Sequence, residues 1–471
     1  FAPSTGNNIT SSPDQMNLAV PVYDRTLTWK GGDAAAPNDW QKKQNWMITG
    51  KPTKVATNAP RTCSEVVIPD VGTVNFPIVS SSGAVSGNLT IQAKGQLSIQ
   101  PGAQLTVSGP TVIHSDSPTA NGSLIADGTF LSGSFTVHRQ LRDIANWGDY
   151  HYFSSPVANQ SISGFKSSDN FPATVWEWLE NNATSWQILS SGNFTSGRGY
   201  NLDQSGGSGM FAFTGSLVTA PFQVTATAPY NSEAEHYNDQ RGLWGGGGWN
   251  LLGNPFPSAM DASRFISANL TSFDPSYQAL YIYDGVSNTY QYAAATIPGY
   301  PGAGLFGSVI QAGQGFYVLP NYSGLSFNFV PGSGTSGMQT HNTAVEMKSA
   351  AKPWPGLTLK AASGEMEKTA TVVYNDQMKA GLDPGYDVGQ LPSGDGFEIY
   401  TALVQDNGVN FTRQALPLAD YHRNIIPVGI DMEEGGIVTI SAQVRSIENQ
   451  RFVLEDRMLH KFINLGEEPY T

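Results

Sequence analysis

The chain has 471 residues and a formal net charge of −13, with only 13% charged residues but 51 glycines and 29 prolines. This acidic balance argues against nucleic acid or an anionic membrane as the main partner, because phosphate contacts need clustered Lys and Arg. No apolar run approaches the ~20 residues that span a bilayer, so no transmembrane segment is expected. The turn-rich, aromatic composition predicts an all-β fold, and the length predicts two to four domains at about 150 residues each.

The first 25 residues form an N-terminal arm without clear periodicity, and residues 26–146 form the first domain. This domain begins with three tryptophans in under twenty residues, Trp29, Trp40 and Trp46, which we expect to seal one end of a β structure. Cys63 is the only cysteine. A single cysteine excludes a disulfide framework and a thiolate zinc site. We expect Cys63 to be a small buried side chain, with an intermolecular disulfide as the alternative.

Three apolar–polar–apolar triplets then recur at an eight-residue step: Leu89–Ile91, Leu97–Ile99 and Leu105–Val107. Each triplet has the period-2 pattern of a half-buried strand. Stacked units of this kind bury one continuous apolar column, so the pattern predicts a β-solenoid in which three strands make one coil. An antiparallel meander would leave the same trace in the sequence, and this alternative stays open.

Residues 147–335 contain an internal sequence repeat, with copies near 147–216 and 246–333. A repeat of this length is one supersecondary unit used twice, so we expect a duplicated β-sandwich module. A short helix is expected within Ser258–Leu270. Five landmarks occur in the same order in the two copies: Tyr150–Pro156 and Trp249–Pro255, Ser163–Phe165 and Ser263–Phe265, Val175–Trp178 and Leu280–Tyr283, Gly197–Tyr200 and Gly313–Phe316, and the pairs Phe211/Phe213 and Phe327/Phe329.

The composition of Pro331–Gly337 indicates a linker, which we place at residues 336–352. Residues 353–471 form a C-terminal β-sandwich, since turn signals fall every eight to fifteen residues between strands expected near 397–403, 425–430 and 437–444. The sequence ends at Thr471 without an obvious finishing element. We therefore expect this sandwich to be incomplete and the chain to be part of a longer protein.

No sequence pattern predicts a catalytic centre. The seven histidines lack the HExxH and HxH spacings of metal sites, and no Gly-x-Ser-x-Gly stands in a strand–helix frame. The densest polar cluster, Glu233–His236 with Asp239, has the composition of a solvated loop. We therefore expect no catalytic residues and a protein that is not an enzyme.

Three tryptophans are candidates for stacking on carbohydrate. Trp176 and Trp178 are two apart, so they share one face of a strand, and Trp186 follows in the next aromatic segment. Exposed, they would form a platform for sugar rings. Packing in the core or between the repeats is the alternative, which is favoured because Tyr281 and Tyr283 occupy the matching places in the second copy.

Three aspartates are candidates for a calcium site. Asp383, Asp387 and Asp395 lie in a loop rich in Gly and Pro, and calcium takes carboxylate oxygens of this kind. The EF-hand spacing is absent, so turn-forming aspartates are the alternative. Calcium is the one cofactor that the sequence leaves open.

A further set of segments, together with the eight-residue triplets, forms a recognisable combination: Thr28–Trp46, Val66–Pro69, Phe76–Pro77, Tyr152–Pro156, Trp249–Pro255, Gly313–Phe316, Gly381–Asp387 and Val453–Asp456. In this combination the chain resembles large surface-exposed proteins of Bacteroidetes that are exported through the type IX secretion system. The resemblance implies a secreted or cell-surface, all-β, mostly non-catalytic protein with a C-terminal sorting domain that the export machinery recognises.

The leading hypothesis is a non-enzymatic extracellular structural or adhesive protein. It would be presented on the outer-membrane surface or assembled into a surface fibre through strand edges and end faces, with copies of itself or other surface proteins as partners. The alternative is a carbohydrate-binding module or carbohydrate-active enzyme that acts on extracellular polysaccharide, with glycans as partners.

Overall fold

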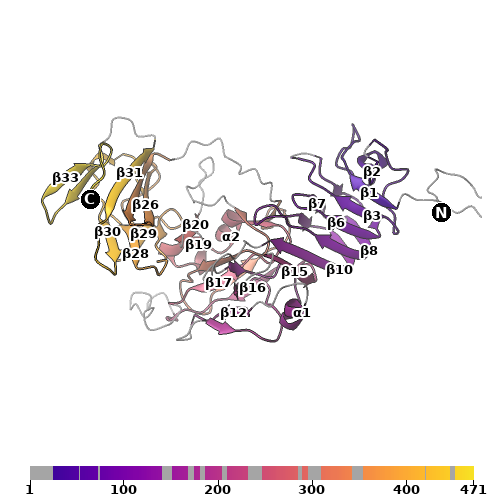
Figure 1. Cartoon of the computed structure of the whole chain (residues 1–471), viewed down its shortest axis with the longest axis horizontal. Helices are drawn as coiled ribbons and strands as arrows, with labels where there is room; N and C mark the ends of the chain where they lie inside the picture. Colours follow the sequence, from indigo (N-terminus) through magenta and orange to yellow (C-terminus); the bar gives the residue numbers. More distant parts are fainter. Residues whose placement is uncertain are drawn as a thin grey trace, which may run out of the picture.

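The computed structural model is an elongated all-β body with a β-solenoid at the N-terminal end and a sandwich at the C-terminal end (Figure 1). The duplicated module lies between them. No helix in the described part of the chain is long and apolar enough to cross a membrane. The structure describes residues 25–51, 53–72, 75–140, 151–167, 174–180, 186–203, 209–231, 247–284, 289–294, 309–341, 354–419, 421–445 and 451–471.

Parallel ladders between successive coils identify the N-terminal region as a solenoid and exclude the meander. Leu89 pairs in parallel with Val66 one coil back and with Thr111 one coil forward. A second, smaller sheet runs in the parallel order β4-β7-β9. The strands of the solenoid are β1 (Thr26–Trp29), β2 (Trp46–Ile48), β3 (Glu65–Ile68), β4 (Ile78–Val79), β5 (Ala84–Ser86), β6 (Asn88–Ile91), β7 (Gln96–Ile99), β8 (Gln104–Ile113), β9 (Ser123–Ala126) and β10 (Thr129–Gln140).

The three tryptophans pack together at the first coils of the solenoid core. Trp46 makes edge contacts with Trp29 and with Trp40, each with 4.8 Å between ring centroids, and all three side chains are buried. Cys63, in contrast, is exposed. The expectation of a buried Cys63 was therefore wrong, because this residue lies in the turn before β3 and not among the inward-facing positions of the strand.

The two copies of the middle module have the same strand order, which confirms the duplication. One four-stranded sheet runs β11-β14-β12-β13 and the other β17-β22-β19-β20. The register also agrees, since Trp176 pairs with Asn201 in copy 1 and Tyr281 with Tyr317 in copy 2. Copy 1 contains β11 (His151–Phe153), α1 (Ile162–Ser167), β12 (Thr174–Trp178), β13 (Trp186–Ile188), β14 (Tyr200–Asp203) and β15 (Met210–Gly215). Copy 2 contains β16 (Phe222–Thr225), β17 (Asn250–Gly253), β18 (Ala259–Asp261), α2 (Ala262–Ala268), β19 (Ala279–Asp284), β20 (Thr289–Ala294), β21 (Val309–Ile310), β22 (Gly315–Val318), β23 (Ser326–Phe329) and β24 (Gln339–Thr340).

Each copy also includes a strand before its first landmark, which the sequence did not reveal. In copy 1, β10 pairs antiparallel with β15, and in copy 2, β16 pairs antiparallel with β23. The paired strands carry the two Phe pairs, and all four of these rings are buried. A pair of strands and a four-stranded sheet therefore enclose the core of each copy.

The helices of the two copies begin in the same way. The Ser161 hydroxyl accepts a hydrogen bond from the Gly164 N–H, and an Asp261 carboxylate oxygen accepts one from the Arg264 N–H, both at 3.1 Å. These N-caps satisfy backbone donors that the first turn of a helix leaves free. Helix α2 lies inside the stretch predicted to be helical, Ser258–Leu270.

The two copies meet through reciprocal contacts, as across a two-fold axis. Ser154 N–H donates to the Gly313 carbonyl at 2.9 Å, and its counterpart Gly253 N–H donates to the Gly197 carbonyl at 3.0 Å. Two bridges repeat the same exchange, Phe153 with Gln314 and Arg198 with Leu252. An interface in which both partners use the same surface is called isologous and is typical of two-fold symmetric dimers. Here the two partners are the two copies within one chain.

This interface explains the Gly-x-Gly phrase that the copies share. A Cβ on Gly199 would lie 2.6 Å from the Leu252 carbonyl oxygen, and one on Gly315 would lie 2.7 Å from the Tyr152 carbonyl carbon. Each of these glycines therefore lets a strand of the other copy approach closely.

The regions expected to be separate are joined by direct contacts. Because β10 belongs to the solenoid sheet and pairs with β15, the sheet continues past the expected boundary at 146/147, which lies outside the described residues.

The stretch with linker composition contacts the solenoid directly. Ser333 donates hydrogen bonds from its N–H and its hydroxyl to the Asp127 carboxylate, at 2.8 and 2.7 Å. His341 lies between the hydroxyls of Ser98 and Ser123, 2.8 Å from each. The first part of the expected linker, residues 336–341, is therefore packed on the solenoid through His341. Residues 342–352 lie outside the described residues.

The C-terminal region is a seven-stranded sheet faced by one hairpin. The sheet runs β30-β28-β29-β26-β25-β31, with β27 paired to β29, and the hairpin is β32-β33. The pairs are antiparallel except β26 with β29. Ile425 and Ile437, expected in strands, are exposed and lie just before them. The strands are β25 (Gly356–Ser363), β26 (Met366–Tyr374), β27 (Val388–Gly389), β28 (Phe397–Ala402), β29 (Asn410–Leu416), β30 (Val428–Met432), β31 (Thr439–Arg445), β32 (Val453–Asp456) and β33 (Lys461–Asn464).

Candidate binding site

A cavity of about 280 Å³ lies between the sheet of copy 2 and the C-terminal sandwich. Binding sites are common at such junctions between domains. One wall consists of tyrosines from β19 and β20, and the other carries polar side chains from the C-terminal sheet and its loops. We call this space the junction cavity.

The tyrosine wall follows from the alternation of β19 and β20. Tyr281 pairs with Tyr292, so both rings lie on the outer face of the sheet, opposite Leu280, which is buried in the core of copy 2. The Tyr281 hydroxyl donates to the Gly389 carbonyl at 2.7 Å and ties the sheet to β27. Burial raises the pKa of Tyr281, Tyr290 and Tyr292 above the usual range, so the three phenols are neutral hydroxyls.

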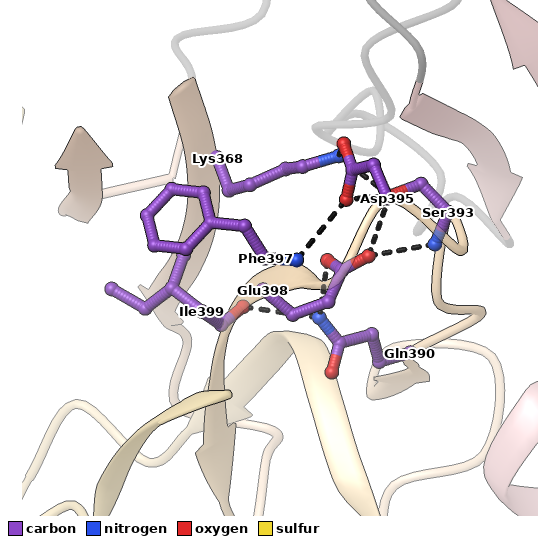
Figure 2. A network of polar contacts seen from close by, with 7 residues as sticks. All are labelled: Lys368, Gln390, Ser393, Asp395, Phe397, Glu398 and Ile399. Carbon is purple, nitrogen blue, oxygen red and sulfur yellow. Dashed lines mark hydrogen bonds and ion pairs between the residues drawn. The ribbon is translucent and has the colours of Figure 1, made fainter. Parts of the chain in front are cut away.

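The polar wall centres on a buried lysine (Figure 2). Lys368 is 5% exposed; its Nζ donates to the Ser393 hydroxyl at 2.6 Å and pairs with Asp395 at 2.7 Å. Glu398 accepts from Ser393 N–H at 2.6 Å and from Gln390 Nε2 at 3.0 Å. The single proton of the Ser393 hydroxyl is shared between Glu398, at 2.7 Å, and Asp395, at 2.9 Å. The lysine and both carboxylates therefore have hydrogen-bonding partners, as buried charges require.

The protonation state of Asp395 argues against a role for this residue as a general acid. Burial alone would raise the pKa of Asp395, but hydrogen bonds from Lys368, Ser393 and Phe397 N–H outweigh burial and hold that pKa below its ordinary value. A general acid at neutral pH needs a raised pKa. Asp395 is thus suited to orienting Lys368.

Two of the three candidate tryptophans lie in an aromatic layer between the copies. Trp178 makes an edge contact with Trp186 at 4.9 Å and another with Tyr317 at 5.4 Å, and its Nε1 donates to the Trp249 carbonyl at 2.5 Å. Trp186 stacks on Tyr152 at 5.8 Å. Trp176 is half-buried on the same strand face as Trp178. Trp178 and Trp186 are also only half-buried, so they combine packing with accessible ring surface.

A row of half-buried rings connects this layer to the junction cavity. From Trp186, the centroid distances are 5.8 Å to Tyr152, 5.7 Å from there to Tyr283, and 5.3 Å on to Tyr290, which lines the cavity. We call these four residues the aromatic row. Copy 1 contributes the first two rings and copy 2 the last two.

The three candidate calcium ligands do not come together. Asp387 accepts from the N–H groups of Asp383 and Ala415 at 2.6 and 2.7 Å, while Asp395 belongs to the Lys368 network. Burial raises the pKa of Asp387 to about 7. Within the described ranges no group of three or more His, Cys, Asp or Glu side chains could hold a metal ion. Asp383 and Asp387 thus form turns, the alternative reading from the sequence.

Sequence reasoning missed Lys368, Gln390, Glu398 and Tyr290. One signal was available for Lys368, because it shares the strand parity of Ala370 and is therefore inward-facing in β26. The cluster Glu233–His236 with Asp239 lies outside the described residues.

Comparison with known proteins gives one match. Neither curated proteins nor solved structures match the chain. A family model matches residues 28–471, which include the solenoid, the duplicated module and the C-terminal sandwich. The chain therefore belongs to the family described as Domain of unknown function (DUF8693).

Proposed function

We propose that this protein is a non-enzymatic structural or adhesive protein that contacts its partners through the C-terminal sandwich. One observation carries the proposal: four large apolar side chains are exposed on the β32–β33 hairpin and its turn. Val453 is 53% exposed, Met458 89%, Leu459 57% and Phe462 71%. Such gatherings of exposed apolar side chains mark interaction sites. We call these four residues the hairpin patch.

The hairpin leaves its own sandwich half covered. Leu454 and Ile463 pack on the sheet, whereas Val453 and Phe462 lie on the opposite face of the hairpin. Apolar residues of edge strand β30, such as Ile430, are only partly buried against the core. The two-stranded hairpin thus faces a sheet of seven strands and covers only part of it. The uncovered part of the sheet fits a partner that adds a strand or an apolar face.

The contacts between regions support a role as a stiff spacer. The solenoid sheet continues into copy 1 through β10–β15, the two copies exchange backbone hydrogen bonds, and Tyr281 ties copy 2 to the sandwich. Such a body would hold the hairpin patch far from the solenoid end (Figure 1). Placement at the outer-membrane surface and export by the type IX machinery follow from the sequence resemblance and belong to this proposal.

The test compares the wild-type full chain with the double variant Met458→Ser, Phe462→Ser. Light scattering over a wide concentration range measures self-association, and pull-down assays measure binding to cells, glycans and mineral. We expect the wild type to associate or bind and the double variant to lose that activity. Leu131→Ser is the matched control, since Leu131 is 48% exposed on the solenoid. A wild type that stays monomeric and binds no surface would overturn the proposal.

A carbohydrate-active protein is the second candidate. The Ser393 hydroxyl lies 2.9 Å from Asp395 and 2.7 Å from Glu398, which places two carboxylates close together beside a tyrosine wall. Retaining glycosidases hold two carboxyl groups about 5 Å apart. The lowered pKa of Asp395 counts against it as the acid. Release of reducing sugar from extracellular polysaccharides, abolished by Glu398→Gln, would support the enzyme; no release with any polysaccharide would remove it.

A further inference from the structure

We infer that the junction cavity binds one ring of a neutral saccharide and that the aromatic row carries the following rings of the same chain. The inference deepens the carbohydrate role proposed as second candidate, in its non-catalytic form. It is independent of the hairpin patch, which lies on another part of the protein.

Aromatic rings supply the first requirement of a sugar site. Pyranose rings present flat C–H faces that pack on aromatic surfaces, and tyrosine adds a hydroxyl at the ring edge. Tyr290 is half-buried at the cavity and continues into the aromatic row, so its ring has packing partners on one side and the cavity on another. Its position is therefore fixed before any ligand arrives.

Uncommitted polar groups on the opposite wall supply the second requirement. The two Nε2 donors of Gln390 are engaged by Glu398 and the Ile399 carbonyl, but its Oε1 has no hydrogen-bond partner among the described residues. The same holds for the hydroxyls of Thr369 and Thr412, which also line the cavity. One amide acceptor and two hydroxyls thus belong to residues that line a space where sugar hydroxyls can replace water.

The charges of the cavity select a neutral ligand. Lys368 is the only cation among the lining residues, and Asp395 neutralises it. Glu367 pairs with Lys360, while Glu398 is held by neutral donors only. An anionic sugar would therefore meet the Glu398 carboxylate beside a lysine already paired with Asp395. Arg413 and Arg445 are near enough to act on the pKa of Tyr292, but neither is among the described lining residues. We therefore expect uronic acids and sulfated sugars to bind more weakly than neutral sugars.

The size of the cavity limits it to one ring. At ~30 Å³ per water, its volume of about 280 Å³ holds about nine waters. A single hexose fits this space, whereas a longer chain must leave past Tyr290. The next three rings of the aromatic row follow at steps of 5.3, 5.7 and 5.8 Å. Oligosaccharides should thus bind more tightly than monosaccharides.

The experiment uses the full chain and a fixed panel of sugars. Saturation-transfer NMR and titration calorimetry measure binding of glucose, galactose, mannose and N-acetylglucosamine and of their tetrasaccharides, beside uronic-acid and sulfated tetrasaccharides. We expect a neutral tetrasaccharide to bind, its monosaccharide to bind at least tenfold more weakly, and the anionic tetrasaccharides to bind more weakly than the neutral one. No neutral binding, or a preference for anionic sugars, would overturn the inference.

Substitutions in the cavity and in the aromatic row locate the site. Thr412→Trp fills the cavity and should weaken tetrasaccharide binding at least tenfold, whereas Leu131→Trp, at an exposed position on the solenoid, should not. Trp186→Ala should weaken the tetrasaccharide several-fold and leave the monosaccharide unchanged. If Thr412→Trp unfolds, Tyr290→Ala gives the same test. Tetrasaccharide binding that survives both Thr412→Trp and Tyr290→Ala contradicts the inference. Self-association of the Met458→Ser, Phe462→Ser variant tests the adhesive proposal independently of saccharide binding.

Discussion

The two copies of the middle module share a backbone but differ on the outer face of their sheets. In copy 2 the positions Tyr281, Tyr292 and Tyr317 are buried, and the C-terminal sandwich docks there through Gly389. The matching residues of copy 1 are Trp176, Ile188 and Asn201, paired in the same register. Ile188 is 58% exposed.

Some of the residues that face inward or meet the other copy are identical in both copies. Phe165 and Phe265 pack on the Phe pair of their own copy, and both Gly-x-Gly phrases lie at the reciprocal interface. The comparison teaches that the inner face and the interface determine the shape, whereas a few outer side chains determine whether another domain docks.

The largest effect is expected from Phe165→Ala and Phe265→Ala. Both rings are fully buried, so each truncation leaves a cavity and should lower the free energy of unfolding by about 3–5 kcal/mol. Urea unfolding monitored by tryptophan fluorescence measures the two losses. Equivalent cores require similar values; a loss below about 1 kcal/mol in only one copy would break the comparison.

A pH titration tests how copy 2 is held on the solenoid, because His341 lies between the hydroxyls of Ser98 and Ser123 in the solenoid. Burial lowers the pKa of His341 from 6.5 to about 4, so the folded protein keeps it neutral. Between these values only the unfolded chain takes up the proton, so stability is lost as pH falls from 6.5 to 4. The loss is at most about 3 kcal/mol. Unfolding at pH 7 and pH 4.5 should show this loss in the wild type and a smaller one in His341→Asn; equal losses would contradict it.

Gly199→Ala and Gly315→Ala test whether the interface is reciprocal. Each added Cβ meets backbone of the other copy below 3 Å, so each should cost about 1–3 kcal/mol of stability. Thermal unfolding measures the shifts. The control is Gly435→Ala, where a Cβ meets nothing within 4 Å. Two unequal shifts, or shifts no larger than the control, would show that the two sides are not equivalent.

The smallest effect concerns the helix caps. Ser161→Ala and Asp261→Ala each remove one acceptor for a backbone N–H and should cost about 1 kcal/mol. Ser161→Asp should retain most of the stability, because aspartate performs the same role in copy 2. A full loss in Ser161→Asp would show that the caps are not interchangeable.

Local patterns predicted the solenoid and the duplication because they repeat in sequence. The triplet beginning at Leu89 and the phrase around Gly197 each recur at a spacing that can be read directly. The roles of β10 and β16 could not be predicted, because neither carries a shared motif and both are defined by their partners, β15 and β23.

The junction cavity required the tertiary structure. Its walls come from β19 and β20 on one side and from residues about a hundred positions later on the other, so no spacing rule connects Tyr290 with Gln390. Composition also misled in two places. The loop of Asp395 has the composition of a calcium loop but pairs with Lys368, and the linker-like Pro331–Gly337 stretch binds Asp127.

Native-state hydrogen exchange of two amides tests the reciprocal interface most directly. Ser154 and Gly253 each donate to a carbonyl of the other copy, at 2.9 and 3.0 Å. We predict that both amides are protected to a similar degree and that Gly315→Ala lowers the protection of both, because the contacts open together. Free exchange at either amide in the wild type, or protection that changes at one and not the other, would contradict the account.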